Sequence, residues 1–151
     1  MFNSAFEQIS VNELDLYPRT LRTEIDELNA MIYDDVNNGV YKTGFATSQK
    51  SYTESFTKLF ECLEELEQRL SINRFLLGDK ITEADWRLFT TLVRFDAVYV
   101  GHFKCNKKRL CDYPNLWGYT RELYQQPGVS ETVDLEHIKH HYYGSHKMIN
   151  P

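Results

Sequence analysis

Cysteine, glycine and proline are scarce in this sequence, and long apolar runs are missing altogether. The three cysteines, Cys62, Cys105 and Cys111, are odd in number and irregularly spaced, which argues against a secreted disulfide scaffold. No apolar stretch approaches the roughly 20 residues of a membrane span. Residues 1–6 lack the basic and apolar parts of a signal peptide. These absences predict a protein of a reducing, cytoplasmic compartment.

Excess basic charge is also missing, since the formal net charge is −5 at pH 7. The longest basic cluster runs from Lys104 to Arg109 and is interrupted by Cys105 and Asn106. Such a short cluster indicates a solvated loop rather than a phosphate-binding patch, so neither nucleic acid nor an anionic membrane is an expected partner. With 42% hydrophobic and 26% charged residues, the composition is typical of one globular domain over residues 1–151.

The apolar residues recur every three or four positions, which is the spacing of amphipathic helices. A first helix is expected from Tyr17-Pro18 to Asn37-Asn38-Gly39, and a second from Ser48, its N-cap, to residues 73–78. The buried stripes of these two helices are predicted to contain Leu21, Ile25, Leu28, Ile32 and Val36, then Tyr52, Phe56, Leu59, Phe60, Leu63, Leu66 and Leu70.

The third helix has the sharpest local signal, because Thr82 and Asp85 have the spacing of a capping box. Its nearly all-round apolar continuation, residues 86–95, indicates a central, buried helix. A fourth helix is expected from about Asn115 to Gln125, with Leu116, Trp117, Tyr119 and Leu123 facing inward. A last one is expected from Val133 to about His141, before Gly144. No segment alternates with the period of a strand, so the pattern predicts an all-α bundle of at least five helices.

Tyrosine is abundant, with ten copies, and several lie where helices are expected to end. Tyr41, Tyr99, Tyr142 and Tyr143 are at such junctions. A phenol offers a flat apolar face and a hydroxyl that both donates and accepts, so converging tyrosines would suit an aromatic ligand with hydroxyl or keto groups. The alternative, tyrosines that edge the core with their hydroxyls in water, fits the pattern alone better.

The remaining reactive residues form no recognisable catalytic or metal motif. His137 and His141 are four residues apart, a possible metal-ligand spacing, but no carboxylate or cysteine completes a zinc motif, so no metal is expected. The cysteines have no CxxC spacing and do not open a helix as a redox cysteine usually does. From its residues alone, the chain contains no self-sufficient catalytic apparatus.

Two sets of residues resemble known proteins. The stretch 78–85, Gly-Asp-Lys-Ile-Thr-Glu-Ala-Asp, resembles the segment that leads into the buried helix of glutathione-transferase C-terminal domains. More specific stretches resemble the glutathionyl-hydroquinone reductases, the Xi class of glutathione S-transferases: residues 16–18, 38–46, 93–99, 101–106, 113–117 and 137–146. The resemblance covers essentially the whole chain and implies an all-α, glutathione S-transferase C-terminal-like helical bundle.

The resemblance also implies a function. In this family a thioredoxin-like N-terminal domain binds glutathione, the co-substrate, and holds a Cys-Pro-Trp motif. The thiolate of that motif attacks the sulfur of a glutathionyl-hydroquinone, the hydroquinone leaves, and a second glutathione resolves the mixed disulfide. The helical domain provides a wall for the quinol ring, and the family's three quinol-binding tyrosines match Tyr41, Tyr99 and Tyr142. Family members are also similar in forming homodimers through the helical domain.

The Cys-Pro-Trp segment is not in this sequence. We therefore expect the C-terminal helical domain alone, residues 1–151, without the thioredoxin-like domain and inactive by itself. Cys62, Cys105 and Cys111 do not match the catalytic position, so no catalytic residue is assigned, and glutathione is expected to bind mainly to the other domain. Whether the chain acts in an enzyme stays open against one alternative, a non-enzymatic protein-interaction module. A conjugating glutathione transferase is a weaker alternative.

Overall fold

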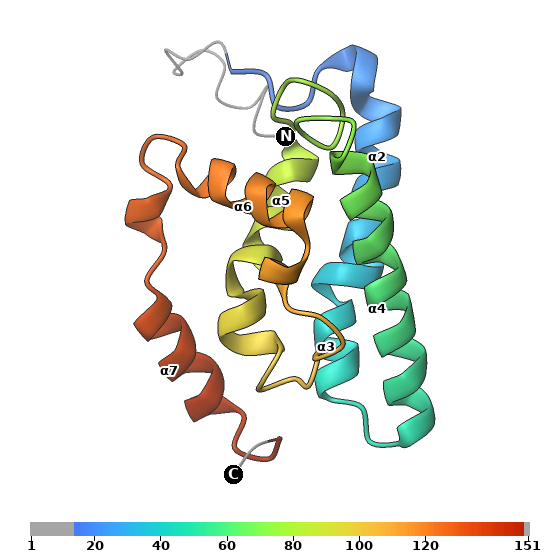
Figure 1. The fold of residues 1–151 in the computed structure, drawn as a ribbon, viewed down its shortest axis with the longest axis vertical. Coiled ribbons are helices and arrows are strands. Elements are labelled where there is room, and N and C mark those ends of the chain that lie inside the picture. The colour runs from blue at the N-terminus through green and yellow to red at the C-terminus, as the bar shows by residue number, and fades with distance from the viewer. Residues whose placement is uncertain (1–13, 150–151) are drawn as a thin grey trace.

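The computed structural model describes residues 14–149. Within this range the structure consists of helices joined by loops and has no β-strand (Figure 1). The all-α class predicted from the sequence is therefore confirmed. No helix in this range is long and apolar enough to cross a membrane. Residues 1–6, on which the signal-peptide argument depends, lie outside the described residues.

The first predicted helix is continuous past its expected end. A 3₁₀ turn, η1 (Arg19–Leu21), leads into α2 (Arg22–Met31), then into a π-helical turn, η2 (Ile32–Asn37), and α3 (Gly39–Gly44). The prediction that Asn37-Asn38-Gly39 ends the helix is wrong: Asn38 is helical, with φ −82° and ψ −25°.

Burial explains why the helix continues. Val36 and Val40 are both completely buried, so the apolar stripe runs on through the asparagines. Gly39 is buried as well and faces α4, since a Cβ on it would lie in ordinary van der Waals contact with Leu59 Cδ1, at 3.6 Å. Core burial outweighs the local tendency of these residues to end a helix. As a result, Tyr41 lies on a helix and not in a loop.

The longest helix, α4 (Gln49–Leu70), begins where the sequence predicts. The Ser48 hydroxyl accepts a hydrogen bond from the Ser51 backbone N–H at 3.1 Å, the expected N-cap geometry. The helix packs along α3 and α6.

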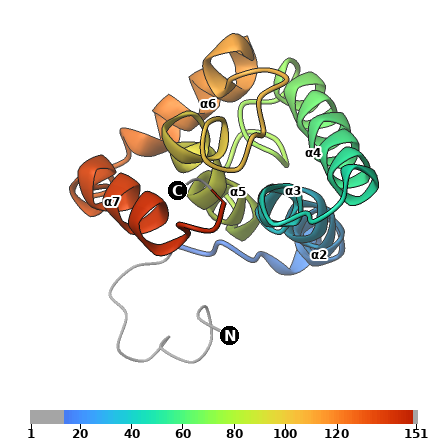
Figure 2. The ribbon, with the colours of Figure 1, turned by 90° about the horizontal axis from the view of Figure 1, so that it is seen from below.

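Helix α5 (Glu83–Arg94) lies in the middle of the bundle (Figure 2). Thr82 and Asp85 form a capping box, in which the Asp85 carboxylate accepts from the Thr82 backbone N–H at 2.7 Å. The same buried carboxylate accepts from the Leu76 N–H at 3.0 Å and from the Tyr119 hydroxyl at 2.9 Å. Asp85 therefore joins the preceding loop, α5 and α6, a role that the local pattern does not indicate.

The C-terminal elements complete the bundle. A second π-helical turn, η3 (Phe95–Tyr99), follows α5, and the 3₁₀ turns η4 (Leu110–Asp112) and η5 (Ser130–Thr132) flank α6 (Pro114–Tyr124). Trp117 is 39% exposed, so its predicted inward position is wrong; its neighbour Leu116 occupies the buried face. The last helix, α7 (Leu135–Ser145), extends past Gly144 and lies at the edge of the bundle, where it contacts η3 (Figures 1 and 2).

Candidate functional site

Three tyrosines from three separate elements bring their hydroxyls together. Tyr41 comes from α3, Tyr99 from the end of η3 and Tyr142 from α7. The Tyr142 hydroxyl lies 2.7 Å from that of Tyr41 and 2.9 Å from that of Tyr99, so it is hydrogen-bonded to both. We call these three residues the tyrosine triad. They are the same three that the family resemblance selects.

Each of the first two triad residues is associated with a π-helical turn. The turn η2 precedes α3 and Tyr41, and η3 contains Tyr99. A π-helical turn inserts an extra residue into a helix and so changes the face on which later side chains project, and such turns are frequent at functional sites. Helical periodicity alone does not reveal these turns, and it therefore cannot place the two hydroxyls.

Phe103 packs against the rings of all three tyrosines. Its side chain is completely buried, and its ring centroid lies 5.1, 5.4 and 5.9 Å from those of Tyr41, Tyr99 and Tyr142. Gly44 makes room for this ring, because a Cβ on it would lie 2.6 Å from Phe103 Cδ1. Neither Phe103 nor Gly44 is identified as a site residue from the sequence, since their contact joins positions far apart in the chain.

The triad residues differ in their access to solvent. Tyr41 is 38% exposed, whereas Tyr99 and Tyr142 are 2% and 8% exposed. Burial, together with the hydrogen bond to Tyr142, raises the pKa of Tyr41 to about 12. Burial likewise raises the pKa of Tyr99 well above its usual value. Both phenols are therefore neutral at pH 7 and retain their protons as hydrogen-bond donors.

A count of protons shows that the triad has a donor to spare. Three phenols carry three O–H donors and have free acceptor lone pairs as well. The two hydrogen bonds between them use two of these protons. One donor thus remains for an outside partner, and the partly exposed Tyr41 gives the triad its contact with solvent. This arrangement suits a ligand oxygen that can both accept and donate.

A histidine pair borders the triad. His102 is completely buried, its Nε2 lies 3.4 Å from His146 Nδ1, and its ring also contacts that of Tyr143. Burial and the neighbouring His146 lower the pKa of His102, which is therefore neutral at pH 7. The other pair that the sequence suggests, His137 and His141, is exposed. Among residues 14–149, no three histidine, cysteine or acidic side chains form a group that could hold a metal ion.

The three cysteines are free thiols with poor nucleophilic character. Burial raises the pKa of both Cys62 and Cys105 to about 12, so their thiolate fraction is very small at neutral pH. Cys111 is exposed, but partial desolvation and the carboxylate of Asp96 raise its pKa too. None of the three has the lowered pKa of a catalytic cysteine.

Alkylation should distinguish these thiols. With iodoacetamide at pH 8 we expect one modification per native chain, at Cys111, because Cys62 and Cys105 are enclosed. In 6 M urea all three should react. Peptide mass spectrometry after timed quenching measures the sites. Rapid native labelling of Cys105 would contradict its complete burial.

Comparison with known proteins identifies the family of the chain. Residues 49–122 match the family model described as the C-terminal domain of glutathione S-transferase. Over all 151 residues the chain is 59% identical to the glutathionyl-hydroquinone reductase YqjG of Escherichia coli (strain K12), covering 46% of that protein. It is 51% identical to the glutathionyl-hydroquinone reductase PcpF of Sphingobium chlorophenolicum, covering 48% of it.

The solved structures agree with the sequence relatives. The glutathione-bound structure of YqjG superposes with a TM-score of 0.97 at 59% identity, covering 100% of this chain and 49% of that one. Glutathione S-transferase Xi from Phanerochaete chrysosporium also gives 0.97, at 52% identity, covering 100% of this chain and 52% of that one. The chain spans about half the length of the curated relatives it matches. The chain therefore belongs to the glutathione S-transferase family as a C-terminal helical domain of the kind found in the Xi class and in the glutathionyl-hydroquinone reductases.

Proposed function

We propose that the tyrosine triad binds the quinol ring of a glutathionyl-hydroquinone, and that this chain is the hydroquinone-binding domain of a glutathionyl-hydroquinone reductase. The observation that carries the proposal is the convergence of three phenol hydroxyls, with those of Tyr41 and Tyr99 both within 2.9 Å of the Tyr142 hydroxyl and one donor left over. Two relatives over 50% identical to the chain bear the name of this reductase, which supports the choice of ligand.

In the proposed reaction a cysteine thiolate attacks the sulfur of the substrate. The carbon–sulfur bond breaks, a mixed disulfide forms with glutathione, and the ring carbon takes up a proton to give the hydroquinone. Neutral phenols suit this step, because they can hydrogen-bond to the quinol oxygens as the ring's electron density changes. A second glutathione thiolate then attacks the glutathione sulfur of the mixed disulfide, glutathione disulfide leaves and the cysteine thiol is restored; this exchange requires no metal ion.

The nucleophilic thiol in this proposal is not one of the three cysteines of this chain. Cys62 and Cys105 are buried with raised pKa values, and the pKa of Cys111 is also raised. We propose that the nucleophile and most of the glutathione site belong to a thioredoxin-like domain, and that the helical domain alone does not turn over substrate. The three free thiols are consistent with the reducing cytoplasm as the proposed location.

Replacing Tyr142 with phenylalanine should weaken hydroquinone binding. The variant loses the hydroxyl that joins Tyr41 and Tyr99, and one hydrogen bond contributes about 0.5–1.5 kcal/mol, which corresponds to a roughly 3- to 10-fold loss of affinity. Isothermal titration calorimetry of this chain and of the variant with 1,4-dihydroxybenzene measures the two affinities.

Tyr143→Phe is the matched control, because Tyr143 is the next residue on α7 but lies outside the triad; it should keep the affinity of the unaltered chain. Equal affinity in all three proteins would contradict the proposed site.

Joined to a thioredoxin-like domain with the Cys-Pro-Trp thiol, the chain should reduce glutathionyl-hydroquinones. A variant with phenylalanine at all three triad positions should then lose most of this activity. A stoichiometric partner protein and no such activity would instead favour the interaction module.

We propose further that the domain forms a homodimer, as the family resemblance implies. Trp117 and Tyr124 lie seven residues apart on one face of α6 and are 39% and 38% exposed, a suitable apolar contact surface. Light scattering after gel filtration should give twice the mass of one chain. Changing both residues to serine should lower the measured mass toward that of the monomer. A dimer that persists in this variant would show that this face of α6 is not the dimer interface.

A further inference from the structure

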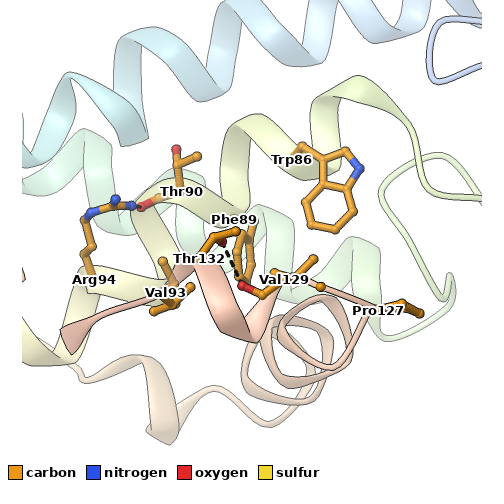
Figure 3. A pocket seen from close by; sticks show the side chains of 10 residues that line it. Trp86, Phe89, Thr90, Val93, Arg94, Pro127, Val129 and Thr132 are labelled. Atoms are coloured by element: carbon orange, nitrogen blue, oxygen red, sulfur yellow. Dashed lines mark hydrogen bonds between the residues drawn. The ribbon is translucent and has the colours of Figure 1, made fainter. Parts of the chain in front are cut away.

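Helix α7 is held to the bundle mainly through its C-terminal half. Tyr142 is the one buried residue of this helix, and Ile138 is half-buried. The hydrogen bonds described for residues 126–137, which lead into α7, join positions at most four apart, like that from the Thr132 hydroxyl to the Val129 carbonyl at 2.7 Å (Figure 3). These bonds do not place α7 against the rest of the bundle, so its position depends on contacts near Tyr142.

His102 lies against the last turn of α7 and is completely buried. Its ring centroid is 4.6 Å from that of Tyr143 and 5.5 Å from that of His146, and its Nε2 lies 3.4 Å from His146 Nδ1. His146 is the C-cap of α7, and its backbone N–H donates to the Tyr142 carbonyl at 3.3 Å. His102 thus contacts the residue that follows Tyr142 and the residue that caps its helix.

His102 is also fixed to the element that carries Tyr99. Its backbone N–H donates to the carbonyl of Val98 at 2.8 Å, and Val98 directly precedes Tyr99 in η3. Its ring is stacked on that of Phe103, with 5.2 Å between the centroids and 28° between the planes, and Phe103 packs against all three triad rings. His102 therefore joins the last turn of α7 to the part of the bundle that places the other triad residues.

A neutral histidine suits this position. Burial lowers the pKa of His102, so that its ring is neutral at pH 7 and has one donor and one acceptor nitrogen. One ring nitrogen faces that of His146, and the flat ring lies against Tyr143 and Phe103. An apolar side chain of similar size would fill the space but would leave His146 without this partner.

We propose that His102 is a positioning residue for the tyrosine triad: it holds the last turn of α7 against η3 and so sets the distance of the Tyr142 hydroxyl from those of Tyr41 and Tyr99. Little else in α7 defines this distance, because Tyr142 is its one buried side chain. The role of His102 rests on the proposed function only for its effect on hydroquinone, since the position of Tyr142 can be measured with no ligand present.

Tyrosine Cζ signals report the triad in the free chain. With all tyrosines labelled with ¹³C at Cζ, His102→Leu should shift the signals of the three triad residues, while circular dichroism at 222 nm shows that the domain stays folded. His102→Gln keeps a donor and an acceptor, and should return the signals most of the way to their original positions. Thr120→Val is the matched control, because it removes another buried hydrogen bond, from the Thr120 hydroxyl to the Leu116 carbonyl in α6; it should leave the triad signals in place.

Amide hydrogen exchange measures how firmly α7 is held. In His102→Leu the amides of residues 139–145 should exchange about 3- to 10-fold faster, the equivalent of one lost hydrogen bond, whereas those of α4 should keep their rates. His146→Ala removes the partner of His102 at the end of α7, away from the core. It should have the same effect on the triad signals and on exchange, and it tests the role even where His102→Leu does not fold.

Hydroquinone binding shows whether His102 acts through Tyr142. His102→Leu should weaken the binding of 1,4-dihydroxybenzene about 3- to 10-fold, as Tyr142→Phe does. Added to Tyr142→Phe, it should cost little more, because the hydroxyl that His102 positions is already gone. A purely structural role would instead give two losses that multiply.

Unchanged triad signals together with unchanged exchange of α7, in both His102→Leu and His146→Ala, would overturn the positioning role. Equal shifts of the triad signals in Thr120→Val, or losses of affinity that multiply, would overturn it as well. If the unaltered chain does not bind 1,4-dihydroxybenzene but the Tyr142 signal still depends on His102, the proposed function fails and the positioning role stands.

Discussion

Replacing Asp85 with alanine should lower the free energy of unfolding by about 3–5 kcal/mol, enough to unfold much of the domain at 37 °C. The Asp85 carboxylate is completely buried and accepts from the backbone N–H groups of Leu76 and Thr82 and from the hydroxyls of Thr82 and Tyr119. Alanine would leave the buried N–H groups of Leu76 and Thr82 without this acceptor, and each unsatisfied buried donor costs about 1–3 kcal/mol. Urea unfolding followed by circular dichroism at 222 nm measures the loss.

Asp112→Ala is the matched control for this prediction. Asp112 also accepts a backbone N–H, that of Arg109, and pairs with its guanidinium, but the pair is exposed at the surface. Its loss should cost less than about 1 kcal/mol. If both variants lost the same stability, the buried position of Asp85 would not be what makes it important.

Replacing Gly44 with alanine should destabilise the domain although glycine is a poor helix former. The added Cβ would lie 2.6 Å from Phe103 Cδ1 and 2.7 Å from Phe103 Cβ, too close for either atom to stay in place. Overpacking of this kind costs about 1–3 kcal/mol. Because Phe103 supports all three triad rings, affinity for 1,4-dihydroxybenzene should fall as well.

Gly118→Ala should change the stability in the opposite direction. Gly118 lies within α6, and no atom is within 4 Å of a Cβ placed there, so alanine should stabilise the helix by up to about 1 kcal/mol. Unfolding midpoints in urea compare the two variants. Stabilisation by Gly44→Ala alone would show that this contact is not tight.

The helices that the sequence predicts well are those in which burial and local signals agree. In α4 the Ser48 cap and the apolar stripe predict the same helix, and in α5 the capping box predicts where the helix begins. The prediction fails at Asn37-Asn38-Gly39, where the local tendency to end a helix competes with the burial of Val36 and Val40. Local patterns do not reveal which of two such effects is larger.

The candidate site depends on information that is not local. Ten tyrosines look alike in the sequence, and only the family resemblance selects Tyr41, Tyr99 and Tyr142. Their contacts depend on the two π-helical turns and on the packing of α7 against η3, which periodicity does not encode.

The central claim is that the tyrosine triad is the hydroquinone site. The most direct test is to label all tyrosines with ¹³C at Cζ, the carbon that bears the hydroxyl, and to titrate the chain with 1,4-dihydroxybenzene. Single phenylalanine variants assign the signals of Tyr41, Tyr99 and Tyr142. These three signals should shift together and saturate with one dissociation constant, while the other seven remain near their starting positions. Saturable shifts confined to other tyrosines, or no saturation at any of the three, would contradict the account.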